Sequence, residues 1–159
     1  MDLFKSLRNF IFSGIISNPM SRKIINKRYN RLTLEQKGRY YTEFANIFNV
    51  RSFNGQNGYW ELSYQNKLIQ IPLNSGQFWL DWDIALSVLG HEIEIIKTYE
   101  ALLNSSMKPE IFVDIGANYG LHSLLFLVHK INTISFEPND YCVNYFVNLC
   151  KANQITPNI

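Results

Sequence analysis

Between residues 111 and 137 the hydrophobic pattern changes from strand-like to helix-like and back again. A short apolar run, 111–113, ends in Asp114 and is followed by a glycine-containing turn, 116–120. After the turn, apolar residues recur every three or four positions, as on one face of a helix: Leu121, Leu124, Leu125 and Val128. A second apolar run, 134–136, ends on Glu137. The order strand, turn, helix, strand predicts the first half of a nucleotide-binding βαβ unit.

The residue types in the turn suit an anionic ligand. Gly116 and Gly120 allow a sharp turn and a close approach of the backbone, since neither carries a Cβ. The following helix presents unpaired N–H groups at its start, which favour a carboxylate or phosphate. Glu137 comes 23 residues after Asp114, at the end of the next strand. An acid at that place can accept hydrogen bonds from both hydroxyls of a ribose.

Two motifs carry a resemblance to a known family. The turn reads VDIGANYG over Val113–Gly120, and the second strand continues into FEPN at Phe136–Asn139. In these motifs the chain resembles the class I S-adenosylmethionine-dependent methyltransferases, and more narrowly the FkbM family. Asn148 and Asn153, near the end of the following helix, add to the resemblance. The similarity covers roughly residues 90–157.

The resemblance implies that S-adenosylmethionine is the cofactor and that both motifs bind it. Its binding residues would be Asp114, Gly116, Ala117, Asn118, Tyr119, Gly120, Ser123, Glu137, Pro138 and Asn139. The loop would surround the methionine part, Ser123 would help to hold its carboxylate, and Glu137 would bind the ribose, with Asn139 near the adenine. A buried strand closed by an Asp-Ile-Gly turn also occurs in α/β proteins without this cofactor, so the second motif is needed for the assignment.

The expected fold is α/β, with the start of a Rossmann-like methyltransferase sheet behind an N-terminal helical segment and a β-hairpin. Complete members of this class resemble a seven-stranded sheet with helices on both faces. Only two such strands are recognisable, and residues 152–159 resemble a loop leading to a third. We therefore expect the C-terminal part of the sheet to be missing. The expected segments are 1–50 (helical), 51–105 (hairpin and linking helix) and 106–159 (truncated cofactor domain).

The first half of the chain predicts helices and a hairpin. Two short helices should be separated at Asn18-Pro19, and a third should run from Thr33 to about Phe48, because Thr33-x-x-Gln36 forms a capping box. Residues 59–73 alternate between apolar and polar, with a turn near Gln65-Asn66. This pattern predicts a β-hairpin, which either packs over the active site or only covers the first helix.

The stretch that joins the hairpin to the glycine turn is harder to interpret. Residues 78–90 mix aromatics with Asp81 and Asp83, and we expect a polar loop between apolar anchors rather than a metal site, since no third oxygen ligand follows. Residues 91–103 have helical spacing. Glu92 or Glu94 would correspond to a cofactor-proximal glutamate of the family, or would be exposed acids that the helix dipole favours.

Charge and cysteine content restrict the partners and the compartment. Residues 1–40 carry a net charge of +7 and residues 41–159 a net charge of −5. The basic cluster 22–31 would be a solvated helix face or, less commonly, a membrane-surface contact. We expect no nucleic-acid partner, because no binding motif accompanies the charge.

Cys142 and Cys150 lie eight residues apart in a predicted helix, so their Cα atoms are ~12 Å apart, which is too far for a disulfide. Buried thiols, no metal site and a cytoplasmic location are therefore expected.

The predicted function is methyl transfer from S-adenosylmethionine, by resemblance to an oxygen such as a hydroxyl of a sugar or other secondary metabolite. The catalytic residues are unknown, and His122 is the only candidate base beside the turn. One alternative is a truncated, non-catalytic fragment with uncovered apolar surface and a tendency to form oligomers. Another is a different nucleotide-binding α/β protein, such as a dinucleotide-dependent oxidoreductase, which the mismatch to G-x-G-x-x-G at Asn118 and Leu121 disfavours.

Overall fold

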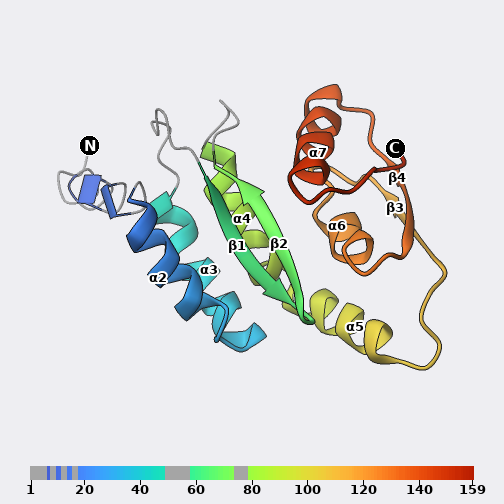
Figure 1. Cartoon of the computed structure of the whole chain (residues 1–159), viewed down its shortest axis with the longest axis horizontal. Coiled ribbons are helices and arrows are strands. Elements are labelled where there is room, and N and C mark those ends of the chain that lie inside the picture. The colour runs from blue at the N-terminus through green and yellow to red at the C-terminus, as the bar shows by residue number, and fades with distance from the viewer. Residues whose placement is uncertain (1–6, 8–9, 12–13, 16–17, 49–57, 74–78) are drawn as a thin grey trace. The chain divides into compact units, whose positions relative to one another are not determined.

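A computed structural model describes residues 7, 10–11, 14–15, 18–48, 58–73 and 79–159, with the side chains of 44–48 and 79–83 outside the description (Figure 1). The described chain is mixed α/β, with six helices, an antiparallel hairpin and a small parallel two-stranded sheet. Its contacts gather into two compact units, residues 1–62 with 71–93 and residues 63–70 with 94–159. Among the described helices, none combines the length and the apolar character needed to cross a membrane.

Helices α2 and α3 of the first unit each begin at a capping residue. Helix α2, Pro19–Tyr29, starts after Asn18, whose side-chain Oδ1 accepts the N–H groups of residues 20 and 21 at 2.9 and 3.2 Å. Helix α3, Leu34–Phe48, starts after Thr33. The Thr33 N–H donates to Gln36 Oε1 at 2.9 Å, and the Gln36 N–H donates to Thr33 Oγ1 at 3.3 Å. This reciprocal pair confirms the predicted capping box.

The prediction of a polar loop over residues 78–90 is wrong for most of that segment, which is helical. Helix α4, Trp79–Gly90, occupies most of the stretch for which a polar loop was expected. Residues 84–90 of the helix are buried or half-buried without interruption, so its sequence lacks the one-sided period by which helices are recognised. Its buried residues are Ile84, Ala85, Leu86, Val88 and Leu89. Residue 78 and the side chains of Asp81 and Asp83 lie outside the described residues.

The hairpin forms as predicted. Strands β1, Tyr59–Tyr64, and β2, Lys67–Pro72, are joined by Gln65 and Asn66, whose φ angles are 45° and 62°. Two consecutive positive φ angles belong to the type I′ turn, which matches the twist of a two-residue hairpin. The apolar residues that alternate along β1 are at most 2% exposed: Trp60, Leu62 and Tyr64. In the first unit, Trp60 packs edge-on against Tyr29 at a centroid distance of 5.8 Å.

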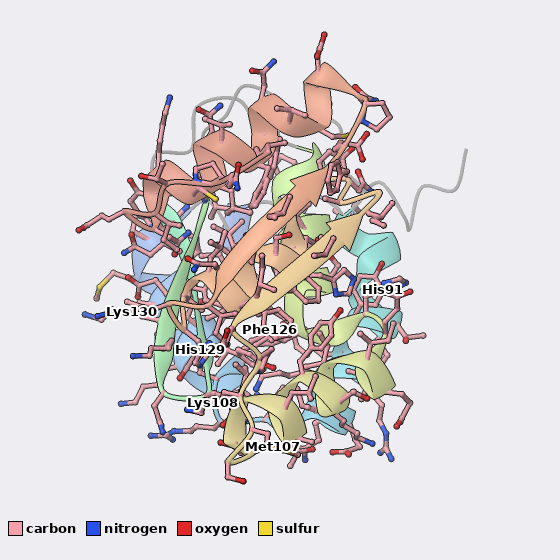
Figure 2. All side chains as sticks on the ribbon, turned by 90° about the vertical axis from the view of Figure 1, so that its right-hand side faces the viewer. His91, Met107, Lys108, Phe126, His129 and Lys130 are labelled. Carbon is pink, nitrogen blue, oxygen red and sulfur yellow. The ribbon has the colours of Figure 1, made fainter. Side chains whose placement is uncertain are left out.

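The second unit contains the predicted strand, helix and strand. It is formed by α5 (Ile93–Asn104), β3 (Ile111–Ile115), α6 (Leu121–Leu127), β4 (Asn132–Phe136) and α7 (Asp140–Ala152). Strands β3 and β4 are parallel, with Ile111 opposite Asn132 and Ile115 opposite Phe136. Their arrows point the same way in Figure 2. The change of hydrophobic period between residues 111 and 137 therefore predicted these elements correctly.

The two faces of this parallel sheet differ. On one face Phe112 stacks on Phe126 of α6 at a centroid distance of 4.1 Å, and Ser135 is buried. Because opposed residues of parallel strands point to the same side, the odd-numbered residues of β3 share the other face with Phe136. Apolar side chains on that face are 49–83% exposed: Ile111, Val113, Ile115 and Phe136. This part of the sheet is thus covered on one side and open on the other.

The tip of the hairpin belongs to the second unit. The Gln70 N–H donates to Asn153 Oδ1 at 2.8 Å, and Asn153 Nδ2 donates to the Gln70 carbonyl at 2.8 Å. Tyr64 meets His129 edge-on at 5.7 Å, at the turn after α6 where Figure 2 labels His129 and Lys130. Helices α6 and α7 start at the carboxyl ends of β3 and β4, so their last residues lie at the opposite edge of the sheet. The tip therefore binds the end of the unit away from the glycine turn.

After α7 the backbone returns to β4. Gln154 adopts a φ of 57°, and the Asn158 carbonyl accepts the Ser135 N–H at 3.0 Å. The last residues thus lie along the edge of β4 that does not pair with β3. This is where the predicted approach to a third strand would place them.

Candidate functional site

The glycine turn lies over the carboxyl end of the parallel sheet. Three of its residues have positive φ, Gly116 at 76°, Asn118 at 51° and Gly120 at 71°. The N–H groups of Gly116 and Ala117 both donate to the Phe136 carbonyl, at 2.9 and 3.1 Å. The turn of one strand is therefore attached to the end of its neighbour, which brings the two sequence motifs together.

Glu137 joins the two motifs directly. Its Oε2 accepts the Asn118 N–H at 2.8 Å, and its Oε1 accepts the Asn139 N–H at 2.8 Å. A carboxylate offers about four lone-pair directions, so each oxygen keeps capacity for a second donor. The side chain that the resemblance assigns to a ribose thus also fixes the conformation of both loops.

Beneath the turn, a buried cluster of hydroxyls holds Asp114. Ser123 is completely buried, and its Oγ donates to Asp114 Oδ2 at 2.7 Å and lies 2.9 Å from Ser135 Oγ. The expected contact between Ser123 and a cofactor carboxylate requires an accessible hydroxyl. In the structure this hydroxyl bonds to Asp114 and so orients its carboxylate beneath the turn.

The two glycines of the turn have different surroundings. A Cβ on Gly120 would overlap the ring of Phe146, so this glycine allows α7 to pack closely on the start of α6. A Cβ on Gly116 would meet no atom of the described residues within 4 Å. Gly120 therefore serves packing, whereas the space beside Gly116 leaves room for a ligand.

The remaining motif residues have defined local contacts. Asn118 Oδ1 accepts the Cys142 thiol at 3.2 Å, and Tyr119 meets Tyr145 edge-on at 5.3 Å. Burial and the nearby negative charge of Glu137 raise the pKa of Cys142. Asn139 caps α7, because its Oδ1 accepts the N–H of residue 141 at 3.0 Å. Its side chain thus has a structural role beside the one that the resemblance implies.

A hollow lies next to these loops, at the carboxyl ends of β3 and β4. Its volume is about 590 Å³, within the usual range of ~300–1,000 Å³ for small-molecule sites. The lining is mostly apolar, with the Glu137 carboxylate as its charged group: Ile115, Gly116, Ser135, Phe136, Glu137, Pro138 and Ile159. A flat apolar group with adjoining hydroxyls, as in a nucleoside, matches this combination.

The structure also describes the candidate base, His122, and the candidate acids, Glu92 and Glu94. His122 is half-buried, with its ring edge-on to Tyr99 of α5 at 5.6 Å. Glu94 is exposed and pairs with Lys97 at 3.1 Å, one turn further along α5. Glu92 adopts a φ of 50° in the break between α4 and α5. None of these observations assigns a catalytic role to His122, Glu92 or Glu94.

The sequence does not predict the contacts of three residues of the second unit, two of them beside the site and one at the opposite end of the unit. Ser135 was included only as part of a strand, although a serine inside an apolar run indicates a buried polar contact. Cys142 was interpreted as core, and its thiol additionally holds Asn118. Asn153 was noted only for the resemblance, and its pairing with Gln70 over 83 residues has no local signal.

Both cysteines are buried free thiols, as expected. Within the described part of the chain, no group of three or more His, Cys, Asp or Glu side chains is arranged to hold a metal ion. Comparisons with protein-family models, with curated proteins and with solved structures find no match to this chain.

Proposed function

We propose that the second unit forms one half of an S-adenosylmethionine site of the FkbM type, in a protein that methylates an oxygen of a sugar or another secondary metabolite. The observation that supports this most strongly is the position of Glu137. Its carboxylate bonds to the glycine turn and to the FEPN segment and borders an apolar hollow of about 590 Å³. Two sequence motifs that were recognised separately thus meet at one side chain.

The residues present fit this cofactor. The remaining acceptor capacity of Glu137 suits the two hydroxyls of a ribose. The apolar lining beside it, including Phe136 and Pro138, suits a purine. The open space next to Gly116 leaves room for the methionine part to approach the backbone.

The part played by these residues in the reaction is binding and orientation. The cofactor supplies a methyl group on a positively charged sulfur. Glu137 and the turn would hold that group in a fixed position, so that an acceptor hydroxyl can approach it in line. Because His122 packs against Tyr99, we assign no base to the described residues.

Calorimetric titration of the purified chain with S-adenosylmethionine, beside NAD, tests the proposal. We expect saturable binding of the first ligand and none of the second. Glu137→Gln should weaken binding at least about tenfold, since one hydrogen bond to a charged group contributes roughly 1.5–3 kcal/mol. Glu110→Gln, at an exposed acid just before β3, is the matched control and should bind normally. A folded protein that gives no heat with S-adenosylmethionine contradicts the proposal.

A further inference from the structure

The outward face of α2 combines exposed apolar and basic side chains. Met20 is 74% exposed and Ile24 is 69% exposed. Lys23, Lys27 and Arg28 are exposed beside them, within about two-fifths of the circumference of the helix. The opposite side of α2 contributes Arg22, Asn26 and Tyr29 to the interior of the unit. Large apolar side chains are thus presented to solvent among cations.

The segment before α2, in the same unit, has the same character. Its described residues are helical, and the apolar ones follow helical spacing with 40–76% exposure: Leu7, Phe10, Ile11 and Ile15. From residue 3 to residue 34 the sequence contains seven Lys or Arg and no acid. Exposed apolar surface and positive charge therefore extend over the same part of the chain.

A groove between α2 and α3 adjoins this face. Its volume is about 500 Å³. Ile24, Ile25 and Leu32 give it apolar walls, and Arg28 and Arg39 place two cations at it, with Gln36, Tyr40 and Glu43 completing the lining. An apolar groove bordered by guanidinium groups suits an acyl chain attached to a phosphate.

These features distinguish between possible partners. Nucleic acid would account for the cations, but Met20, Ile24 and Phe10 offer it no hydrogen-bonding groups. A neutral apolar partner would account for these three residues, but it leaves the cations without counter-charges. An anionic lipid bilayer satisfies both groups, because apolar side chains enter the acyl region while Lys and Arg contact headgroup phosphates.

We propose that the outward face of α2, together with the described apolar residues that precede it (Leu7, Phe10, Ile11 and Ile15), docks on an anionic phospholipid bilayer. Met20 and Ile24 enter the interface, and Lys23, Lys27 and Arg28 contact lipid phosphates. The proposal is independent of the cofactor site, which lies in the other unit. Docking through this face would keep the protein at a membrane surface.

Co-sedimentation with vesicles tests this, using phosphatidylcholine with and without phosphatidylserine. We expect the full chain to bind the anionic vesicles and to be released by high salt. Lys23→Glu with Lys27→Glu should weaken binding at least about 25-fold, since each cation near an anionic surface contributes roughly fivefold. Lys67→Glu with Lys108→Glu makes the same change of net charge at exposed lysines elsewhere and should have little effect.

A matched pair of serine variants tests the contribution of the apolar side chains to vesicle binding. Ile24→Ser should weaken vesicle binding several-fold, whereas Leu68→Ser, at a leucine 57% exposed on the hairpin, should not. Circular dichroism of every variant should match the parent, because all these side chains are exposed. Equal loss in both lysine pairs, no binding to anionic vesicles at low salt, or tighter binding to duplex DNA or RNA than to vesicles at the same salt would each overturn the proposal.

Discussion

Alanine at each of the two glycines in the turn should have different consequences. Gly116 and Gly120 have nearly the same φ, 76° and 71°. Alanine at either position therefore introduces the same left-handed strain. Only at Gly120 does the new Cβ overlap the ring of Phe146, which is 1% exposed and fixed in the core of the second unit. The pair thus separates backbone strain from steric overlap.

The magnitudes follow from these two effects. A left-handed conformation costs a residue with a Cβ roughly 1–2 kcal/mol. Overpacking in a buried site costs about 1–3 kcal/mol more. Gly116→Ala should therefore lower the free energy of unfolding by roughly 1–2 kcal/mol and Gly120→Ala by roughly 2–5 kcal/mol, against a usual total of ~5–15 kcal/mol. The first variant should stay folded and lose affinity for S-adenosylmethionine, because the added methyl occupies the space beside the turn.

Urea unfolding followed by circular dichroism measures both differences. The variant Phe146→Ala, alone and combined with Gly120→Ala, completes a double-mutant cycle. Removing the ring should relieve the overlap, so the cycle should show a coupling of about 1–3 kcal/mol. Equal destabilisation by the two glycine variants, together with a coupling below about 0.5 kcal/mol, would show that the close packing on Phe146 has no energetic importance.

Three further predictions concern the rest of the second unit. Asn153→Ala removes both bonds to the hairpin and should destabilise by roughly 1–3 kcal/mol in urea, whereas Asn144→Ala, exposed on the same helix, should change stability by less than about 0.5 kcal/mol. Burial raises the pKa of Cys150 to about 12 from its usual 9. The native state thus keeps a proton that the unfolded chain loses as the pH rises. The urea concentration at the unfolding midpoint should therefore decrease between about pH 8 and about pH 10, and the decrease should be smaller in Cys150→Ala. An equal decrease in both proteins contradicts this. Ile115→Lys, on the open face of the sheet beside Phe136, should reduce self-association in analytical ultracentrifugation, and a monomeric parent protein would refute the reasoning.

Local chemistry made most elements predictable. The capping box at Thr33, the alternation around Trp60 and the switch of period after Gly120 each depend on residues close together in sequence, and each prediction is confirmed. Helix α4 was not predicted because its described residues 84–90 are buried or half-buried in an unbroken run, which leaves no periodic pattern. The local sequence of α4 carries no periodic signal for a helix, because the burial of its residues depends on contacts with residues distant in sequence.

The site was predictable in its outline but not in its contacts. Motif spacing indicated that Glu137 and the glycine turn would lie at one edge of the sheet, and they do. The sequence could not predict that each carboxylate oxygen of Glu137 accepts one backbone N–H of the loops. The directions of these N–H groups depend on the loop conformation. The burial of Ser123 likewise depends on Ser135, which comes from the neighbouring strand.

The pairing of Asn153 with Gln70 also has a consequence for synthesis of the chain. The two residues are 83 positions apart, so at about 5–20 residues per second the ribosome adds Asn153 roughly 4–17 s after Gln70. During that interval the Gln70 backbone groups at the edge of β2 lack their later partner, and an open strand edge can pair with other chains. Asn153 is therefore a partner that this edge gains late in synthesis, and the backbone groups of Gln70 stay open to other chains until the end of α7 has been made.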